Sequence, residues 1–475
     1  MQLALGVDSS TQSTKVEARD LATGTVIATG SAPHPPTTPP LSEQDPASWW
    51  SALSIAIEQL GQHRRDVVAV SVAGQQHGMV LLDGDGESLT PAQLWNDTRG
   101  AANAEAMVDG LGATAWAQAC GSVPLASFTV AKLAWMQEHK PAILSRVRKI
   151  MLPHDYLTWR LSGEHVTDRG DASGTGWFNP SDGMYRPDLL ANAVDDADTL
   201  SLCLPQVVDH RTPAGTLSAD AASALGLPAG IPIGAGTGDN MAGALGLGLR
   251  PGDVAMSLGT SGTVYSIATS PTADPSGLVA GFADATGAYL PLVCTLNATK
   301  VTDTVASWLG TDAAGLSDLA IEAGTDFDGT VLVPYFDGER TPSRPDATGT
   351  FTGLRTSTSR EMLARAAHDG VLCGLLDGLD ALRAAGVASD GTMHLIGGGA
   401  RSAAYRQRCA DLLGTSIVVP DTDETVATGA AVLAARLIDG LWDTPPDWGL
   451  GQGDTVEPRT IDIASVRDAY AEARG

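Results

Sequence analysis

Short apolar runs alternate with longer amphipathic segments along the whole chain. Val67–Val72 and Met79–Leu82 are apolar runs of strand length, bounded by glycines and by the turn sequence Asp83–Gly86. Asp45–Leu60 begins with an Asp-Pro pair, a typical cap and first helical residue, and continues with apolar residues at helical spacing. This alternation of strand and helix signals predicts an α/β fold with mixed sheets.

Two segments half a chain apart resemble each other. Leu3–Ala18 (LALGVDSSTQSTKVEA) and Val254–Ala268 (VAMSLGTSGTVYSIA) each have the pattern of a strand, a turn of small and hydroxylated residues, and a second strand. Two such hairpins suggest a duplicated domain. The glycine-rich segment Gly243–Arg250 is suited to a hinge. We therefore expect two domains, at residues 1–243 and 244–475.

Composition and charge narrow the classes of partner. The 475 residues include 29 basic and 55 acidic ones, a formal charge of −26, which disfavours nucleic acids and anionic membranes. No apolar run approaches the roughly 18 residues of a membrane span, and the first residues lack the basic start of an export signal. Five widely spaced cysteines fit buried thiols better than a disulfide frame or a zinc site. These features predict a cytoplasmic protein. The sequence does not determine the oligomeric state, and a homodimer is one alternative.

The common nucleotide and metal signatures are absent. None of the five lysines follows a glycine, so a Walker A loop is excluded. The chain also lacks the HRD and DFG motifs of protein kinases and the HExxH motif of zinc hydrolases. Any phosphate site must be of another kind.

Three turns are suited to contact phosphate groups. In Asp8–Lys15 (DSSTQSTK) a carboxylate at a strand end precedes hydroxyl side chains and backbone N–H groups that can cradle phosphate oxygens. Leu258–Gly262 (LGTSG) permits close backbone approach, and Ile396–Ser402 (IGGGARS) joins a strand to a helix start. Each turn alone is also common as a purely structural connection. Together they suggest a nucleotide held between two lobes.

Asp239 lies in Gly234–Gly243 (GAGTGDNMAG), a glycine-rich turn that opens a predicted helix. Its carboxylate could cap that helix. Alternatively, it could act as the base that takes a proton from a substrate hydroxyl about 3 Å away. Gln75–His77, between two glycines, and Leu94–Arg99 (LWNDTR) add polar groups that could hydrogen-bond a polyol, although buried histidine and tryptophan are also common in cores.

In their order along the chain these motifs resemble those of the FGGY carbohydrate kinases, a branch of the actin and hexokinase superfamily. The resemblance covers nearly the whole chain. It implies an α/β fold of two actin-like domains, each built on a ribonuclease H-like mixed sheet, with the active site in the cleft between them. The matching segments are GVDSSTQSTK, SEQDPASWW, AGQQHGM, LWNDTR, LPHDYL, DASGTGW, GDNMAG, SLGTSG, PYFDGERTP and LIGGGARS.

The resemblance also implies roles for individual residues. It places two catalytic carboxylates at Asp239, the general base, and Asp8, and it places Mg²⁺ at both. The sugar site would comprise Gln76, His77 and Asn240 together with Asp239. The residues expected to contact ATP lie in the three turns and are Thr11, Ser13, Lys15, Gly259, Thr260, Gly398, Gly399 and Ser402.

The implied activity is phosphoryl transfer from ATP to D-xylulose, which gives D-xylulose 5-phosphate. The first domain would bind the sugar and supply the base, and the second would bind ATP. Family members acting on xylulose often have Met where this chain has Gln76, so L-ribulose, gluconate or another polyol is an alternative substrate. An actin-like ATPase without a sugar acceptor is an alternative of a different class, against which segments 75–77 and 95–99 argue.

Overall fold

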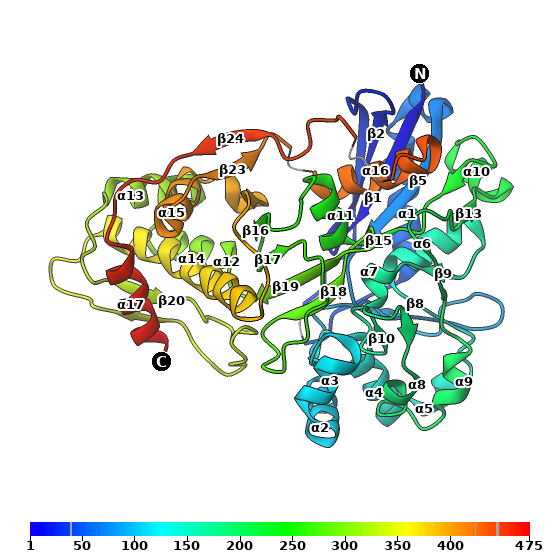
Figure 1. Cartoon of the computed structure of the whole chain (residues 1–475), viewed down its shortest axis with the longest axis horizontal. Helices are drawn as coiled ribbons and strands as arrows, with labels where there is room; N and C mark the ends of the chain where they lie inside the picture. The colour runs from blue at the N-terminus through cyan, green and yellow to red at the C-terminus, as the bar shows by residue number, and fades with distance from the viewer. Residues whose placement is uncertain (39, 423, 443–445) are drawn as a thin grey trace. The chain divides into compact units, whose positions relative to one another are not determined.

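The computed structural model describes residues 1–38, 40–422, 424–442 and 446–475. The chain divides into two compact α/β units, each assembled from three segments (Figure 1). Sugar binding in residues 1–243 and ATP binding in residues 244–475 stay predictions. The first unit comprises Met1–Gly248, Thr269–Leu290 and Glu424–Leu450, and the second comprises Leu249–Ala268, Pro291–Asp423 and Gly451–Gly475.

The first unit is built on a mixed sheet with the order β13-β14-β5-β1-β2-β3, and β15 also pairs with β5. β1 and β2 form the predicted hairpin, and β1 runs parallel to β5. Every residue of β1 is buried, as expected for a central strand covered on both faces. The strands are β1 (Leu3–Ser9), β2 (Ser13–Asp20), β3 (Val26–Pro33), β5 (Val67–Gly74), β13 (Gly215–Thr216), β14 (Pro232–Ile233) and β15 (Thr237–Gly238).

Helix α1 (Pro46–Glu58) covers one face of this sheet. Asp45 is its N-cap and accepts a hydrogen bond from the backbone N–H of Ala47 at 2.9 Å, as the Asp-Pro start predicts. The apolar face of α1 packs into a continuous buried core with the strands and α6 (Pro153–Ser162). That core includes Leu3, Leu5, Val7, Trp49, Leu53, Ile57, Val70, Val72, Tyr156 and Leu157.

Helix α16 (Thr425–Asp439) covers the opposite face and packs on β1, β5 and α11 (Asp239–Gly246) (Figure 1). Small residues make this approach close. A Cβ atom at Gly6 would lie only 2.0 Å from the carbonyl oxygen of Ala427, and one at Gly246 only 1.9 Å from that of Thr425. The packing of α16 therefore holds α11, whose first residue is Asp239, against the sheet.

In the part of the chain that the structure describes, every helix is too short or too polar to cross a membrane.

The remaining elements of the first unit lie outside the sheet described above. These elements are β4 (Glu43–Gln44), η1 (Gly61–Asp66), β6 (Val80–Leu82), β7 (Ala92–Gln93), α2 (Ala101–Leu111), α3 (Ala113–Cys120), α4 (Thr129–His139), α5 (Pro141–Leu144), β8 (Lys149–Met151), β9 (Val166–Thr167), α7 (Arg169–Ala172), β10 (Phe178–Asn179), β11 (Met184–Tyr185), α8 (Pro187–Leu190), α9 (Ala197–Ser201), β12 (Gln206–Val207), α10 (Ala219–Leu225) and β18 (Ala280–Ala283).

The second unit repeats the hairpin arrangement, as the sequence predicts. β16 and β17 pair antiparallel from Val254 opposite Ser266 to Leu258 opposite Gly262, and β16 runs parallel to β22. The sheet continues in the order β19-β17-β16-β22-β23-β24. Its elements are β16 (Val254–Leu258), β17 (Gly262–Ser266), β19 (Tyr289–Thr295), α12 (Thr299–Trp308), α13 (Ala313–Glu322), β20 (Val331–Val333), β21 (Thr350–Thr352), α14 (Arg360–Ala384), β22 (Met393–Ile396), η2 (Gly398–Arg401), α15 (Ala403–Leu413), β23 (Ile417–Pro420), β24 (Gly453–Val456) and α17 (Ile463–Arg474).

Candidate active site

Asp8 lies near the carboxyl end of β1. Its backbone is opposite Lys15 on β2 and opposite Ala73 on β5. The side chain is buried, and the hydroxyl of Ser10 donates a hydrogen bond to Oδ1 at 2.5 Å. Burial raises the pKa of Asp8 to about 6, although the bond from Ser10 and the charge of Lys15 oppose the shift.

Asp239 follows a strand on the other side of β5. Thr237 of β15 is also paired with Ala73, so β15 and β1 flank the same end of β5. Asp239 is the first residue of α11, whose N-cap is Gly238 and carries no side-chain capping bond. The carboxylate of Asp239 lies one position inside the N-cap and accepts the backbone N–H of the next residue, Asn240, a local bond that is compatible with a role as base.

The surroundings of Asp239 raise the pKa of its carboxyl group. Its Oδ1 accepts hydrogen bonds from the backbone N–H of Asn240 at 2.8 Å and from the Asn240 side-chain amide at 2.9 Å. Burial, and then the charge of Asp8, raise the pKa of Asp239 to about 7, while the bonds from Asn240 oppose the shift. A carboxyl group with a pKa near neutrality is well matched to accept a proton from an alcohol.

Gln76 lies beside Asn240 and is buried. The side-chain amide of Asn240 donates a hydrogen bond to Oε1 of Gln76 at 2.9 Å. Among the described residues, Nε2 of Gln76 has no hydrogen-bond partner, and neither has Nε2 of Gln75. A buried donor without a partner costs about 1–3 kcal/mol, so a hydroxyl-bearing ligand at this position would recover that free energy.

His77 has a strained backbone and a fixed ring. Its φ is 65°, and no other non-glycine residue in the described ranges has a positive φ. Nδ1 donates to the carbonyl oxygen of Gly174 at 2.8 Å, and the ring stacks on Phe128 at 5.0 Å between centroids. A Cβ atom at residue 174 would lie 2.5 Å from Nδ1, so the glycine is required for this contact. Strain of this kind is concentrated at functional sites.

Two residues of the first turn make contacts that the sequence did not predict. The hydroxyl of Thr11 accepts a hydrogen bond from Nε1 of Trp95 at 2.9 Å and donates to Oε1 of Gln75 at 3.2 Å. Nζ of Lys15 binds both carboxylate oxygens of Glu424, at 2.7 and 2.9 Å. Ser13 is the first residue of β2 and is partly buried. Contact of Thr11, Ser13 and Lys15 with ATP stays a prediction.

The polar residues of segment 94–99 make two kinds of contact. Nε1 of Trp95 donates a hydrogen bond to the hydroxyl of Thr11 in the first turn. Asp97 and Arg99 instead bond each other at 2.7 Å, and Arg99 also pairs with Glu43 at 2.5 Å and lies over the ring of Trp135. Asp97 and Arg99 therefore form an ion-pair network that stabilises this loop.

In the second unit, the turn with Gly259 and Thr260 joins β16 to β17. The backbone N–H of Thr299, at the start of α12, donates to the carbonyl oxygen of Gly259 at 2.9 Å, and that of Ala298 donates to Thr260 at 3.2 Å. β22 runs parallel to β16 and leads into the turn that begins at Gly397. Both turns therefore lie at the same edge of the sheet, where the sequence-based hypothesis expects phosphate and adenosine contacts.

The three glycines of the turn Ile396–Ser402 differ in their surroundings. Gly397 has a φ of 85°, and a Cβ atom there would lie 2.7 Å from the carbonyl oxygen of Leu258. A Cβ at Gly399 would meet Leu258 and Thr299, whereas one at Gly398 would meet nothing within 4 Å. The backbone at Gly398 is thus open to a ligand, although contact of these residues with ATP stays a prediction.

Ser402 has a structural role in this turn. It is the N-cap of α15, and its Oγ accepts a hydrogen bond from the backbone N–H of Tyr405 at 3.3 Å. The same hydroxyl contacts that of Ser317 on α13 at 3.0 Å. Its predicted contact with the nucleotide would add to this capping role.

Sequence reasoning missed a buried ionic cluster in the first unit. Nε2 of His154 lies 3.2 Å from Asp155 Oδ1, 3.4 Å from Asp168 Oδ1 and 3.3 Å from Asp171 Oδ2. All four side chains are buried. The four residues lie in Leu152–Leu157 (LPHDYL) and Asp168–Trp177 (DRGDASGTGW), and nothing in the sequence shows that these two segments meet.

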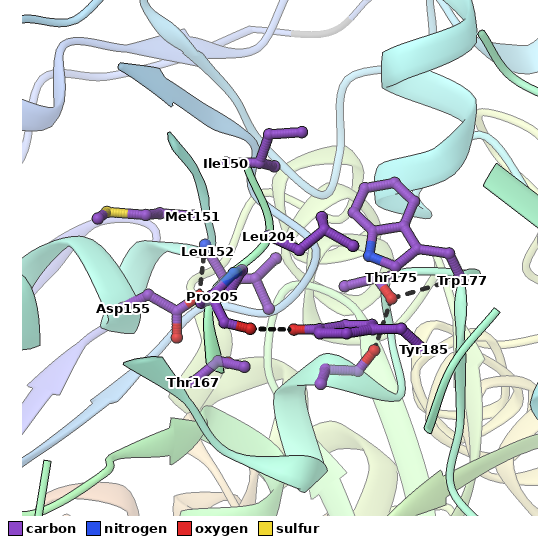
Figure 2. Close-up of a pocket in the computed structure, with 11 residues that line it drawn as sticks. Ile150, Met151, Leu152, Asp155, Thr167, Thr175, Trp177, Tyr185, Leu204 and Pro205 are labelled. Atoms are coloured by element: carbon purple, nitrogen blue, oxygen red, sulfur yellow. Dashed lines mark hydrogen bonds between the residues drawn. The ribbon is translucent and has the colours of Figure 1, made fainter. Parts of the chain in front are cut away.

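Asp155 of this cluster also lines a small cavity (Figure 2). Asp155 and Thr167 line it together with apolar residues, and the hydroxyl of Tyr185 donates to the carbonyl oxygen of Pro205 at 2.8 Å. The space within it holds about one water molecule. The cavity is therefore too small for a sugar, and the polar groups around Asp239 remain the candidate site.

Two domain models of one protein family match the chain. The N-terminal domain of the FGGY family of carbohydrate kinases matches residues 3–246, and its C-terminal domain matches residues 254–438. The chain belongs to the FGGY family of carbohydrate kinases. The predicted family and the predicted fold of two actin-like domains are confirmed.

Individual FGGY kinases are similar over almost the entire chain. A xylulose kinase from Streptomyces coelicolor is 49% identical over 442 residues, which cover 92% of this chain and 88% of that protein. The crystal structure of xylulose kinase from Bifidobacterium adolescentis has a TM-score of 0.88 and 42% identity, and it covers 100% of this chain and 99% of its own. A gluconate kinase structure from Lactobacillus acidophilus has a TM-score of 0.91 at 25% identity, covering 100% and 97%.

Membership of the family establishes the type of reaction. An FGGY carbohydrate kinase is a phosphotransferase with an alcohol group as acceptor, and ATP is its phosphoryl donor. The predicted enzyme class is confirmed. The fold alone does not select the sugar, because the gluconate kinase structure superposes as well as the xylulose kinase structure does.

Proposed function

We propose that the protein transfers the γ-phosphoryl group of ATP to the terminal hydroxyl of D-xylulose, forming D-xylulose 5-phosphate and ADP. Support for this sugar comes from the 49% and 42% identity to two xylulose kinases, against 25% to the gluconate kinase. The observation that carries the proposal is the group formed by Asp239, Asn240 and Gln76, which combines a near-neutral carboxyl with a buried, unpartnered amide donor.

Asp239 is the general base in this proposal. Both hydrogen bonds from Asn240 go to Oδ1, so we propose that Oδ2 accepts the proton of the sugar hydroxyl. The terminal O–H bond of the sugar breaks as its oxygen attacks the γ-phosphorus, and the proton passes to Asp239. The bond from the γ-phosphorus to the bridging oxygen breaks in turn, and that oxygen leaves with ADP.

Gln76, His77 and Asn240 orient the sugar. Nε2 of Gln76 would donate to a sugar hydroxyl, which would give this buried group the partner it lacks among the described residues. The strained turn at His77 and its stacking on Phe128 hold the ring rigidly. Rigid placement of the acceptor near the base lowers the barrier because less orientational freedom is lost in the transition state.

Asp8 and Asp239 fit a bound Mg²⁺. Magnesium is commonly held by one or two carboxylates, with water and substrate phosphate oxygens as the other ligands. The two carboxyl groups are close enough for the charge of Asp8 to raise the pKa of Asp239, and a cation would remove that repulsion. When bound, Mg²⁺ would offset charge on the phosphate oxygens. Thr11, Ser13, Lys15 and the two turns of the second unit remain our proposed ATP contacts, and Lys15 would have to exchange Glu424 for phosphate.

We also infer a cytoplasmic location, because all five cysteines are buried thiols outside any disulfide, and the expected setting for such thiols is a reducing compartment. A homodimer stays a prediction, and light scattering during size-exclusion chromatography would measure the mass of the assembly directly.

The test of the proposed function is ADP release from MgATP in the presence of different sugars. D-xylulose should give the highest kcat/KM in a panel with L-xylulose, L-ribulose, D-gluconate and glycerol, and a reaction without sugar should be much slower. A higher kcat/KM for another polyol would replace the substrate but keep the family. ATP turnover that no sugar changes would contradict the kinase function itself.

A further inference from the structure

The histidine at the centre of the buried cluster lies directly against the turn that leads to Asp239. Gly236 has a φ of 81°, and a Cβ atom there would lie 2.7 Å from Nδ1 of His154 and 2.5 Å from the carbonyl oxygen of Val72. The backbone at residue 236 therefore contacts the His154 ring, with no space for a side chain. Asp239 is only three residues further along.

A hydrogen bond connects the same cluster to β15. The hydroxyl of Thr237 donates to Oδ2 of Asp168 at 2.8 Å. Asp168 is itself fixed, because its two oxygens accept bonds from the backbone N–H groups of Gly170 at 2.8 Å and Asp171 at 2.9 Å. Asp168 thus joins the start of α7 to the strand that ends one residue before Asp239.

The cluster also reaches the sugar-binding turn. The backbone carbonyl oxygen of Asp171 accepts from the N–H of Gly174 at 2.9 Å, and the carbonyl oxygen of Gly174 accepts from Nδ1 of His77 at 2.8 Å. One buried group of side chains is therefore connected both to the strand before the proposed base and to a proposed sugar contact.

We propose that Asp168 is a positioning residue for phosphoryl transfer: held in the buried cluster around His154, it fixes Thr237 and so sets the place of Asp239 relative to the sugar hydroxyl. This inference rests on the proposed function, in which Asp239 is the base. Burial raises the pKa of Asp155 to about 6 and that of Asp171 well above its ordinary value, so ionised carboxyl groups in this cluster are costly, and a protonated His154 supplies the positive charge that opposes their repulsion. Errors of about 1 Å in the placement of reacting groups can reduce a rate about a hundredfold.

The sharpest test changes the connection and leaves the ionic cluster in place. Thr237→Val removes the hydroxyl that binds Asp168 and keeps the shape of the side chain, whereas Thr237→Ser keeps the hydroxyl. Thr158→Val is the matched control, because Thr158 is buried on α6, near His154 in sequence, and its hydroxyl has no partner among the described residues. Each variant is assayed with MgATP and D-xylulose, and sugar affinity is measured separately without nucleotide by calorimetry.

We expect Thr237→Val to lower kcat at least tenfold, with less than a threefold change in the Kd for D-xylulose and a Tm close to that of Thr158→Val. Thr237→Ser should restore most of the lost kcat. Equal kcat values for Thr237→Val and Thr158→Val would overturn the positioning role, and so would a loss that Thr237→Ser does not restore.

Asp239→Asn, assayed in parallel, separates this inference from the proposed function. A large loss of kcat in Asp239→Asn with no loss in Thr237→Val would reject the positioning role alone. A near-normal kcat in Asp239→Asn would reject the assignment of the base, and the positioning role with it.

Discussion

The side-chain amide of Asn240 donates a hydrogen bond to Oε1 of Gln76 at 2.9 Å, although 164 positions separate the two residues in the chain. The same amide binds Oδ1 of Asp239. Asn240 therefore connects the turn that carries the proposed sugar contacts to the proposed base. Through this connection a change at Gln76 can alter both sugar affinity and the orientation of the carboxylate.

Replacing Gln76 with Leu tests this connection. Gln76→Leu removes the acceptor for Asn240 and the buried donor proposed for the sugar, at similar side-chain size. A lost hydrogen bond that leaves a buried partner unsatisfied costs about 1–3 kcal/mol, so we expect kcat/KM for D-xylulose to fall about tenfold or more. Gln62→Leu, at an exposed position, is the control. Equal kcat/KM values in the two variants would remove Gln76 from the sugar site.

Removing His154 should lower stability in a pH-dependent way. Burial alone would lower the pKa of His154, but Asp155, Asp168 and Asp171 together raise it to about 9, above the ordinary value of 6.5. The protonated ring therefore stabilises the folded state fully below pH 6.5, and this stabilisation is lost as the pH rises through about 9. Breaking a buried ion pair by removing one partner costs about 3–5 kcal/mol, the loss expected for His154→Gln at pH 6.

Urea unfolding of the wild type and His154→Gln at pH 6, 7, 8 and 9.5 measures this dependence. The difference in the free energy of unfolding should be largest at pH 6 and should shrink toward pH 9.5. His63→Gln, at a partly exposed position, controls for the loss of a histidine as such. A difference that stays constant across this range would show that His154 is not charged in the folded protein.

The cysteines should be unreactive in the folded protein. All five are buried, and burial raises the pKa of Cys120 to about 11 and that of Cys409 to about 12. Because the thiolate is the reactive form, we expect no rapid reaction with Ellman's reagent at pH 8 in the native state. Unfolding in guanidinium should then expose five thiols per chain. Rapid labelling of any cysteine before unfolding would show that its thiol is accessible in the folded protein.

Much of the fold follows from local patterns in the sequence. The hairpins β1–β2 and β16–β17, the strand β5 and the capped start of α1 lie where apolar runs, turns and an Asp-Pro pair predict them. These signals are local because strand pairing across a short turn and helix capping depend on neighbouring residues. The division into three-segment units could not be predicted in this way, since α16 joins the first unit through close packing on Gly6 and Gly246.

The candidate site was predictable in its residues but not in its contacts. Glycine turns and strand ends indicate Asp8 and Asp239, and the sheet register brings both to the same end of β5. The pairing of Lys15 with Glu424 and the convergence of three aspartates on His154 join segments distant in sequence. Such ion pairs depend on tertiary structure, and no local periodicity indicates them.

The most direct test of the proposed mechanism is the kcat of Asp239→Asn with MgATP and D-xylulose, measured beside the Kd for D-xylulose. Asn keeps the size and polarity of the side chain but cannot accept the proton, so kcat should fall by several orders of magnitude while the Kd for the sugar and the Tm change little. A variant that retained near-normal kcat would show that Asp239 is not the base and would contradict the mechanism proposed for this kinase.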